Sequence, residues 1–512
     1  MPSSRGRGNH GGVRGAEFAP KSPSLEGRFG RLFRQLPSAQ FTEPALVALG
    51  KLMTAPHEDA PTPETEVDDE ENQGINAGYT YLGQFIDHDL TFDPASSLQK
   101  QDDPDALVDF RTPRFDLDNI YGRGPDDQPY LYEEDGRHLQ LGRPLTGNAQ
   151  DRDTRDVPRH TSQSISGGRA RALIGDPRND ENVIVSQLQA TMLRFHNKIA
   201  NEHPGKSFQE IQRLVRWHYQ WVVLHDFLPT IAGQPMLDSV LPRPEKPDLK
   251  FFHWKKEPFI PIEFSVAAYR FGHSMVRPIY RLNTSTPGTN PNPGPKDDPS
   301  NGRQDIFHHD DDFKSLNGFR EFPSNWAIEW NLFFDMGDNL PNVGVKRLQK
   351  AYKIDTSLVN PLGDLPLSVA SDPPHALAVR NLVRGLRMGL PSGQDVARAM
   401  GVEPLSDDVL KVGKATEGES PKNQRLVDIP DFGKEFVGKA PLWYYILAEA
   451  QQQFKKDDTP IRLGPVGGRI VVETFVGLMV GDGHAFLSAD PDWAPNKDRK
   501  FMMSDLIKAI AP

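Results

Sequence analysis

Two long helical patterns stand next to each other between residues 183 and 231. The first, VIVSQLQATMLRFHNKIAN (183–201), spaces its apolar residues three and four apart: Val185, Leu188, Met192, Phe195 and Ile199. The second, SFQEIQRLVRWHYQWVVLHDFLPTI (207–231), opens with Ser207 and Glu210 in capping-box spacing, and we expect its helix to end at Pro229. Adjacent amphipathic helices must bury their apolar faces against other elements, so the sequence predicts a mainly α fold.

The remaining chain predicts further helices joined by long irregular segments. Helical patterns recur at 326–334 and 435–454, and 376–400 resembles a broken helix. Strand signals are few and short, and VVE at 471–473 fits a helix equally well. The 43 glycines and 46 prolines require many connections. We expect a disordered arm (1–20), an extension with an acidic, Pro-rich loop (21–74, loop at 55–74), and one large domain (75–512) interrupted by a loop at 284–305.

Composition excludes several classes of protein. A net charge of −11 argues against general nucleic-acid binding. The absence of cysteine excludes disulfides, thiolate nucleophiles, cysteine-bound zinc, iron–sulfur clusters and thiolate-ligated haem. The basic start of the chain has no apolar core, and the apolar run IVVETFVGLMVG contains Glu473, so neither a secretory signal nor a membrane span is expected. Cytoplasmic location or export without such a signal both fit, and the oligomeric state stays open.

The segment NAGYTYLGQFIDHDLTFDP (76–94) places three titratable residues in an apolar setting. If 80–92 is a helix, Gln84 and His88 share a face, and Asp87 lies beside that face. Asp89 points about 100° further round, towards a different neighbour. Buried charges need partners or a metal, so one helix could serve two sites. A structural histidine with two solvated carboxylates is an equally good interpretation of this segment alone.

Four further segments carry candidate residues. In RTPRFDLDNIYGRGPDD (111–127), Thr112, Asp116 and Asp118 offer oxygen ligands that suit calcium, although an Asx-rich turn explains them as well. Arg178 and Glu181 stand at the start of a long helix, where such a pair is commonly structural. The other candidates are His273 in an apolar segment, typical of a core histidine, and the series Asn381, Arg384 and Arg387.

Five motifs taken together, in this order, resemble the animal-type haem peroxidases of the peroxidase–cyclooxygenase superfamily, especially their cysteine-free bacterial members. The motifs are GQ-x-x-DHDLTF, D-x-D-x-x-YG, R-x-x-E, Y-R-x-GH-S-x-x-R-P and N-x-x-RG-x-x-x-GLP, and the resemblance runs from about residue 75 to about 490. It implies a single large helical haem-peroxidase domain with long loops and little β structure. It further implies haem b, hydrogen peroxide as oxidant, small reducing substrates and a part in the response to oxidative stress.

The resemblance also assigns roles around the haem. His88 matches the distal acid–base histidine, Gln84 the distal glutamine and Arg178 the distal arginine that stabilises developing charge. His273 matches the proximal iron ligand, and Asn381 the amide that accepts its Nδ1 proton. Arginines are expected near the haem propionates, and the matching residues are Arg270 and Arg384.

Two carboxylates match those that become ester-linked to haem methyl groups in animal relatives, namely Asp87 and Glu181. Relatives with a third link have a methionine directly after this glutamate, whereas this chain has Asn182, so that link cannot form. By resemblance, the favoured donors are bromide, iodide, thiocyanate or organic molecules rather than chloride.

Asp89 matches a calcium ligand next to the distal histidine. The implied partners are Thr112, the Arg114 carbonyl, Asp116 and Asp118. The ion would tie the distal helix to the loop and fix His88. The family often has serine where Asp118 stands, so this ligand is a departure from the pattern.

Three alternatives remain. A fatty-acid dioxygenase of the same superfamily needs a radical tyrosine three residues before the proximal histidine, where this chain has Arg270, and Tyr269 is expected to face elsewhere. A metal-dependent phosphohydrolase could use His88–Asp89, His225–Asp226 and the run from His308 to Asp312. A catalytically silent interaction module is disfavoured by the complete set of distal and proximal residues.

Overall fold

The computed structural model describes most of the chain. The described residues are 27–56, 70–91, 108–109, 111–160, 170–285, 303–309, 315–415, 427–429, 433–454 and 459–511. The expected arm at 1–20, residues 57–69 of the acidic loop, residues 286–302 of the second loop, and 310–312 lie outside them.

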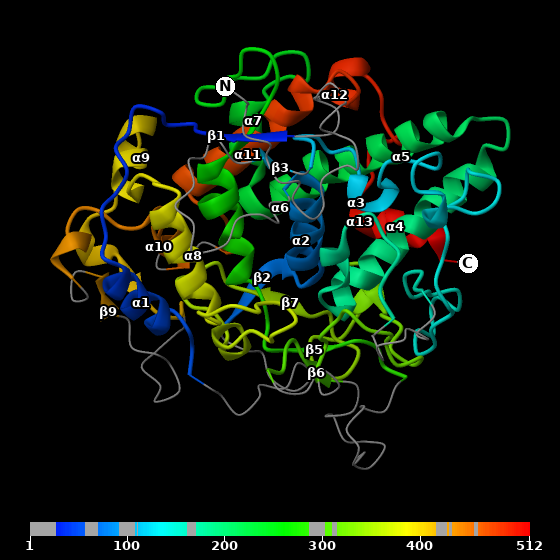
Figure 1. The fold of residues 1–512 in the computed structure, drawn as a ribbon, viewed down its shortest axis with the longest axis horizontal. Coiled ribbons are helices and arrows are strands. Elements are labelled where there is room, and N and C mark those ends of the chain that lie inside the picture. Colours follow the sequence, from blue (N-terminus) through cyan, green and yellow to red (C-terminus); the bar gives the residue numbers. More distant parts are fainter. Residues whose placement is uncertain are drawn as a thin grey trace, which may run out of the picture.

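The fold is mainly α, as the sequence predicts, and resembles one helical domain with small sheets (Figure 1). The longer helices are α1 (Glu43–Leu52), α2 (Gly78–Leu90), α4 (Val183–Glu202), α5 (Phe208–Val222), α8 (Leu377–Arg387), α9 (Gly393–Met400), α10 (Leu442–Phe454), α11 (Pro465–Gly481) and α13 (Met503–Ile510). The shorter ones are α3 (Asp118–Tyr121), α6 (Leu228–Ala232), α7 (Gln234–Val240) and α12 (Phe486–Ala489).

The described strands are all short. They are β1 (Gly27–Gly30), β2 (Glu71–Asn76), β3 (Val108–Asp109), β4 (Ile260–Pro261), β5 (Ile279–Arg281), β6 (Arg303–Asp305), β7 (Lys350–Tyr352), β8 (Lys411–Val412) and β9 (Val427–Asp428). They pair as β3-β1-β4, β2-β7, β5-β6 and β8-β9. These pairs pin loops in place, while the helices enclose the core.

The two adjacent helical patterns form α4 and α5, and the capping box of Ser207 and Glu210 is present. The prediction that the second helix ends at Pro229 is wrong. A π-helical turn, Val223–Phe227, follows α5 directly, and α6 then carries the helical path to Ala232 with Pro229 in its first turn. Pro229 has no amide hydrogen to donate, and the change from the π-helical turn to α6 falls directly before it.

The helix expected over 326–334 is also wrong except for a short 3-10 helix, Trp330–Leu332. The side chain of Gln187 on α4 explains the difference. Its Nε2 donates to the Trp326 carbonyl (2.6 Å), and its Oε1 accepts from the Ile328 amide (2.9 Å). This buried amide takes the backbone partners that a helix would otherwise use.

A ribbon of β2 and β7 fixes the start of α2. The buried Glu71 on β2 accepts from Arg277 (2.7 Å) and Arg347 (2.8 Å). The chain then enters α2 at Gly78, where an added Cβ would lie 2.5 Å from the Phe334 ring, so only glycine permits this approach. The ribbon therefore sets where the first residues of α2 stand.

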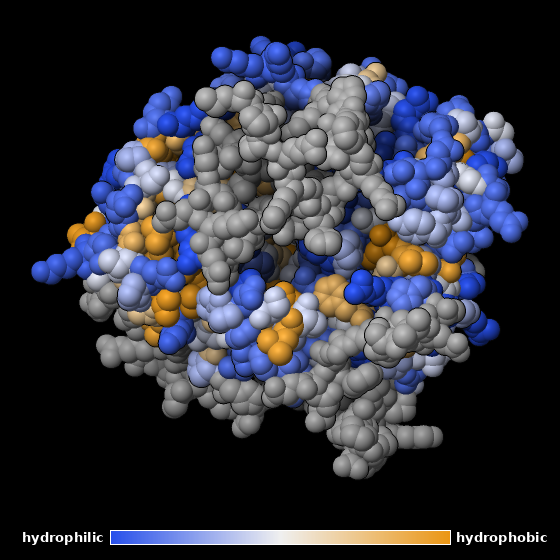
Figure 2. All heavy atoms as spheres, in the orientation of Figure 1, coloured by the Kyte–Doolittle hydropathy of each residue, from blue (hydrophilic) through white to orange (hydrophobic). Residues whose placement is uncertain are grey.

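The helix α2 runs through the middle of the molecule, with α4 and α5 on one side and α8 and α10 on the other (Figure 1). The described part of the face in Figure 2 is largely hydrophilic, with hydrophobic residues in several separate groups. Among the helices that the structure describes, none is both long and apolar enough to cross a membrane.

The buried Asp226 connects α2 to the last helix. Its Oδ1 accepts from the Tyr79 hydroxyl (2.6 Å), and its Oδ2 accepts from the Met503 amide at the start of α13 (2.8 Å). Residues 79, 226 and 503 are thus held together by one carboxylate.

Candidate functional site

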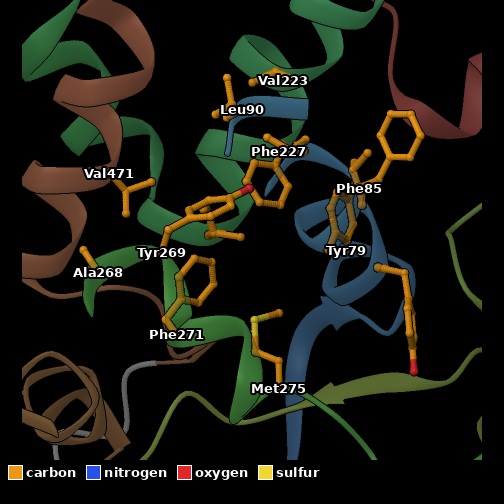
Figure 3. Packing of buried hydrophobic residues seen from close by; sticks show 14 of the residues in the cluster. Tyr79, Phe85, Leu90, Val223, Phe227, Ala268, Tyr269, Phe271, Met275 and Val471 are labelled. Atoms are coloured by element: carbon orange, nitrogen blue, oxygen red, sulfur yellow. The ribbon is translucent and has the colours of Figure 1, made fainter. Parts of the chain in front are cut away.

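A cavity of about 290 Å³ separates α2 from the 3-10 helix Ala268–His273. In Figure 3, Tyr269, Phe271 and Met275 lie on one side of the open space and α2 with Tyr79 on the other. The polar residues in its wall are Gln84, Asp87, His88, Glu181, Asn182, Arg270, His273 and Arg380, beside apolar residues such as Ile306, Phe307 and Leu365. Polar groups converging on one apolar cavity are typical of a ligand site.

His88 stands in this wall with its tautomer set by a buried chain of amides. The Nδ1 of His88 lies 2.7 Å from Oδ1 of Asn179. The Nδ2 of Asn179 donates to Gln189 (2.8 Å), and Gln189 donates to the Asn119 carbonyl (3.1 Å). Because each amide is oriented by the next, Asn179 presents an acceptor to His88, which keeps the proton on Nδ1 and leaves Nε2 as the base.

Burial and the nearby Arg178 charge lower the pKa of His88 to about 4. The imidazole is therefore neutral at neutral pH and able to accept a proton.

Arg178, in the 3-10 turn Pro177–Asp180, lies beside the C-terminal end of α2, but its guanidinium is not in the cavity wall. Its Nη2 donates to the carbonyls of His88 (3.2 Å) and Thr91, and to the carboxylate of Asp176 (2.8 Å). Asp176 is fully buried and also caps the turn Pro177–Asp180 by accepting from the Arg178 amide (2.8 Å). The structure thus holds the arginine beside His88 through a carboxylate.

Gln84 and the two candidate ester carboxylates share the cavity wall. Gln84 donates to Glu181 (3.3 Å) and accepts from Asn182 (3.1 Å). Burial raises the pKa of Glu181 to about 7. The Asn182 side chain also caps α4 by accepting from the amides of Ile184 and Val185. Its presence at this position therefore has a structural explanation.

His273 ends the 3-10 helix on the other side of the cavity. Its Nδ1 lies 2.8 Å from Nδ2 of Asn381 on α8, while Oδ1 of Asn381 accepts from Arg270 (3.0 Å). The predicted contact between Asn381 and His273 is present, but Asn381 faces Nδ1 with its NH₂ group as the donor. Its amide oxygen, the predicted acceptor, binds Arg270 instead. Burial and the Arg270 charge lower the pKa of His273 to about 3, so the ring is neutral, as a metal-ligating imidazole must be.

Arg384 and Arg387 follow Asn381 on α8. Burial lowers the pKa of Arg270; the charge of Arg384 lowers it further, and the Asp87 carboxylate acts in the opposite direction. Arg387 lies away from the cavity, where it pairs with Glu43 (3.3 Å). In the cavity wall the structure instead has Arg380, one residue before Asn381.

The predicted calcium residues lie together on the far side of α2. Ligand atoms of Asp89, Asp116 and Asp118 all lie within 4.8 Å of one another. Both oxygens of the fully buried Asp89, and one oxygen each of Asp116 and Asp118, have no hydrogen-bond partner. Thr112 donates to Asp116 (2.6 Å), and Arg114 belongs to the same loop, its amide donating to Thr112 (2.8 Å).

Buried carboxylate oxygens without donors favour a bound cation, because isolated buried charge is otherwise very costly. Burial and the facing Asp116 carboxylate raise the pKa of Asp89, which is the response expected when no cation neutralises the cluster.

Tyr269 does line the cavity, contrary to the expectation from an α-helical rotation. Every residue from Tyr269 to His273 lies in the cavity wall, so the rotation between Tyr269 and Arg270 does not turn Tyr269 away from it. Its hydroxyl donates to the Gly83 carbonyl (3.2 Å), and its ring stacks on Phe264.

The His–Asp pairs of the phosphohydrolase alternative do not form one site. His225 is exposed and stacks on Trp221, while Asp226 points inwards to Tyr79 and Met503. Within the described ranges, the one cluster of three potential metal-ligating side chains is that of Asp89, Asp116 and Asp118, here called the acidic cluster. It contains no histidine.

The sequence analysis missed Asn179, Asp176 and Arg380. Asn179 and Asp176 flank Arg178 in the chain, but polar residues at a helix start are common caps, so position alone does not single them out. Arg380 could have been found from its place beside Asn381.

A model of the animal haem peroxidase family matches residues 96–322. Mouse myeloperoxidase is 27% identical over 130 residues, which cover 24% of this chain and 17% of that protein. A peroxidase-like protein of Margaritifera margaritifera is 34% identical over 116 residues, 21% of this chain and 14% of that protein. The matching stretch therefore spans less than a fifth of these curated relatives.

Solved structures resemble the whole chain. Peroxidase A from Dictyostelium discoideum is 16% identical with a TM-score of 0.61, covering 96% of this chain and 94% of that chain. The fatty acid α-dioxygenase of Arabidopsis thaliana is 13% identical with a TM-score of 0.50, covering 93% and 74%. These likenesses establish a common fold.

Fold, motifs and family match together define a peroxidase-type helical domain built around a cavity. Over residues 96–322 the chain is similar to the animal haem peroxidase family. That family implies haem as cofactor, and the residues present fit it: two neutral histidines line one cavity, with cationic side chains at its wall.

Proposed function

We propose that this protein is a haem peroxidase, which reduces hydrogen peroxide and oxidises small organic donors or halide-like anions. The observation that carries the proposal is the pair of neutral histidines, His88 and His273, in the wall of one cavity, each with Nδ1 held by an amide. His273 is the proposed iron ligand, and His88 the proposed acid–base group.

Haem, when bound at His273, would supply the redox chemistry that cleaves the O–O bond of peroxide. Nε2 of His88 would accept a proton from one oxygen of hydrogen peroxide and return it to the other oxygen, which would leave as water. Asn179 keeps the other ring nitrogen protonated, so that Nε2 stays available. Arg178, which lies beside His88 but outside the cavity wall, would have to turn towards the cavity to stabilise the charge that develops on the departing oxygen.

On the proximal side, we propose that Asn381 accepts the Nδ1 proton of His273 once Arg270 has moved from the amide oxygen to a haem propionate. Arg270 lines the cavity, and it donates hydrogen bonds to the Ser265 carbonyl and to the Asn381 amide oxygen, neither of which is a carboxylate. A propionate offers the charge-assisted bond that the amide does not. Arg380 and Arg384 stand on the same side as further partners.

We further propose calcium at the acidic cluster of Asp89, Asp116 and Asp118, with Thr112 and the Arg114 carbonyl. The unpartnered buried oxygens support a hard cation with oxygen ligands. Since Asp89 directly follows His88, the cation would fix the end of α2.

The test of the function is an absorption spectrum of the haem-loaded protein before and after one equivalent of hydrogen peroxide. We expect a Soret band that shifts on peroxide and returns when bromide or a phenol is added. A folded protein that binds no haem would contradict the proposal. A Soret band whose position does not change when peroxide is added would also contradict it.

Fatty-acid oxygenation is the second candidate, favoured only by the place of Tyr269 in the cavity wall. Oxygen uptake with a fatty acid, in the absence of bromide and phenol, distinguishes it. We expect none, because the Tyr269 hydroxyl is tied to a carbonyl and Arg270 takes the radical position.

Covalent attachment of haem is a separate expectation. Asp87 and Glu181 both line the cavity, so each carboxylate would face a haem bound there. We expect mass spectrometry of peroxide-treated holoprotein, after denaturation, to find haem mass on the peptides that carry Asp87 and Glu181. Asp87→Asn and Glu181→Gln should each remove one attachment and leave the other. Release of all the haem on denaturation would contradict the assignment.

A further inference from the structure

Asp176 is a single buried carboxylate shared by two arginines. Its Oδ2 accepts from Nη2 of Arg111 (2.6 Å) and from Nη2 of Arg178 (2.8 Å). Its carboxylate is 0% exposed, so water screens it weakly, although the Arg178 side chain is 25% exposed. One negative charge cannot fully neutralise two guanidinium groups, and the two arginines therefore compete for it.

Arg111 also faces the acidic cluster. Its Nη1 lies 3.9 Å from Oδ2 of Asp118, while Nη2 donates to the Gly175 carbonyl (3.1 Å). Burial lowers the pKa of Arg111, but Asp176 and then Asp118 and Asp89 raise it above the usual value, so the guanidinium is a fixed positive charge between both sites.

The loop that carries Asp118 and the turn that carries Arg178 are in direct backbone contact. The Asp176 amide donates to the Asn119 carbonyl (3.1 Å). A Cβ on Gly175 would lie 2.2 Å from the Asp118 carbonyl oxygen. The loop that carries the cluster and the turn that carries Arg178 therefore touch through their backbones as well as through Arg111.

We propose that Asp176 is a positioning residue that couples the acidic cluster to Arg178, so that a cation at the cluster and an anionic ligand in the cavity strengthen each other's binding. The proposal rests on the proposed function for the identity of the cavity ligand. It assigns no role to Asp176 in the chemistry itself.

The direction of the coupling follows from the shared charge. A cation neutralises Asp118 and repels Arg111, which then binds Asp176 more completely. Arg178 is correspondingly less tightly held and can turn towards an anion in the cavity. Conversely, an anion that draws Arg178 away leaves Asp176 to Arg111, so Arg111 competes less with the cation for Asp118. Such coupling is reciprocal by thermodynamic necessity.

The test uses calcium chloride and cyanide as probes, with both dissociation constants measured by titration of the haem-loaded protein. In the unsubstituted protein we expect calcium to tighten cyanide binding by about five-fold or more, a typical size for coupled sites. Asp176→Asn should reduce this factor to less than about two-fold. It should also weaken calcium binding, because Arg111 then turns to Asp118.

Arg111→Gln should change calcium affinity in the opposite direction to Asp176→Asn. It also tests the proposal if Asp176→Asn does not fold. It should also abolish the coupling, but it should tighten calcium binding, because the cation no longer competes with a guanidinium. A merely structural role predicts weaker calcium binding for both variants. Asp151→Asn, which breaks another buried aspartate–arginine pair, Asp151–Arg194 (2.5 Å), is the matched control and should keep the coupling.

Coupling that survives in Asp176→Asn or in Arg111→Gln overturns the proposal, and so does weaker calcium binding in Arg111→Gln. Loss of haem binding in all proteins contradicts the proposed function instead. In that case, calcium titration of the haem-free proteins still decides whether Asp176→Asn and Arg111→Gln shift the calcium affinity in opposite directions.

Discussion

Replacing His273 with alanine should leave a folded protein that no longer ligates haem iron. The imidazole is neutral and its ring lines the cavity, and no second histidine stands on that side among the cavity residues. We expect the Soret band of the reconstituted variant to resemble that of unligated haem, measured by absorption and by haem content per protein. Added imidazole should restore a ligated spectrum, because the substitution leaves space where the ring stood.

The matched control is His225→Ala, which removes a histidine whose exposed ring stacks on Trp221 outside the cavity. This variant should bind haem normally. A His273→Ala protein with unchanged haem content and spectrum would remove the proximal assignment.

Replacing His88 with leucine should slow the reaction with hydrogen peroxide by about 10²–10⁴-fold, the usual contribution of a positioned acid–base group. Haem content should not change, since His88 is not the proposed ligand. Stopped-flow absorption at several peroxide concentrations measures the rate constant. A rate within two- or three-fold of the unsubstituted protein would show that another group moves the proton.

The same rate should depend on pH in a way set by His88. Burial and the Arg178 charge lower the pKa of this ring to about 4, so the base is present above that pH and lost below it. The rate should therefore stay constant from neutral pH down to about 5 and fall near 4. Asn179→Asp places a negatively charged carboxylate beside Nδ1 of His88, which favours the protonated ring and should move this fall to higher pH.

The sequence could predict those parts of the fold and site whose signals are local. The three- and four-residue spacing located α4, and the capping box located the start of α5. The ordered motifs indicated which residues to bring together, and the structure has His88 and His273 in one cavity and Asp89 with Asp116 and Asp118 in one cluster.

What the sequence could not predict depends on partners from distant segments. Residues 326–334 have a helical pattern, but Gln187 takes their backbone hydrogen bonds. The role of Asn179 can be recognised only in the fold, where α2 places Nδ1 of His88 2.7 Å from Oδ1 of Asn179. Likewise, the direction of the Asn381 contact depends on Arg270 competing for the amide oxygen.

The carboxylate of Asp226 has a consequence for synthesis of the chain on the ribosome. Since it binds both Tyr79 and the Met503 amide, the start of α2 has its full set of contacts only after about 424 further residues, from 79 to 503, have been made. Contacts between such distant segments form slowly, and the growing chain emerges from its beginning. Haem uptake should therefore be a late event, and nascent chains that stop before α13 should retain the cofactor poorly.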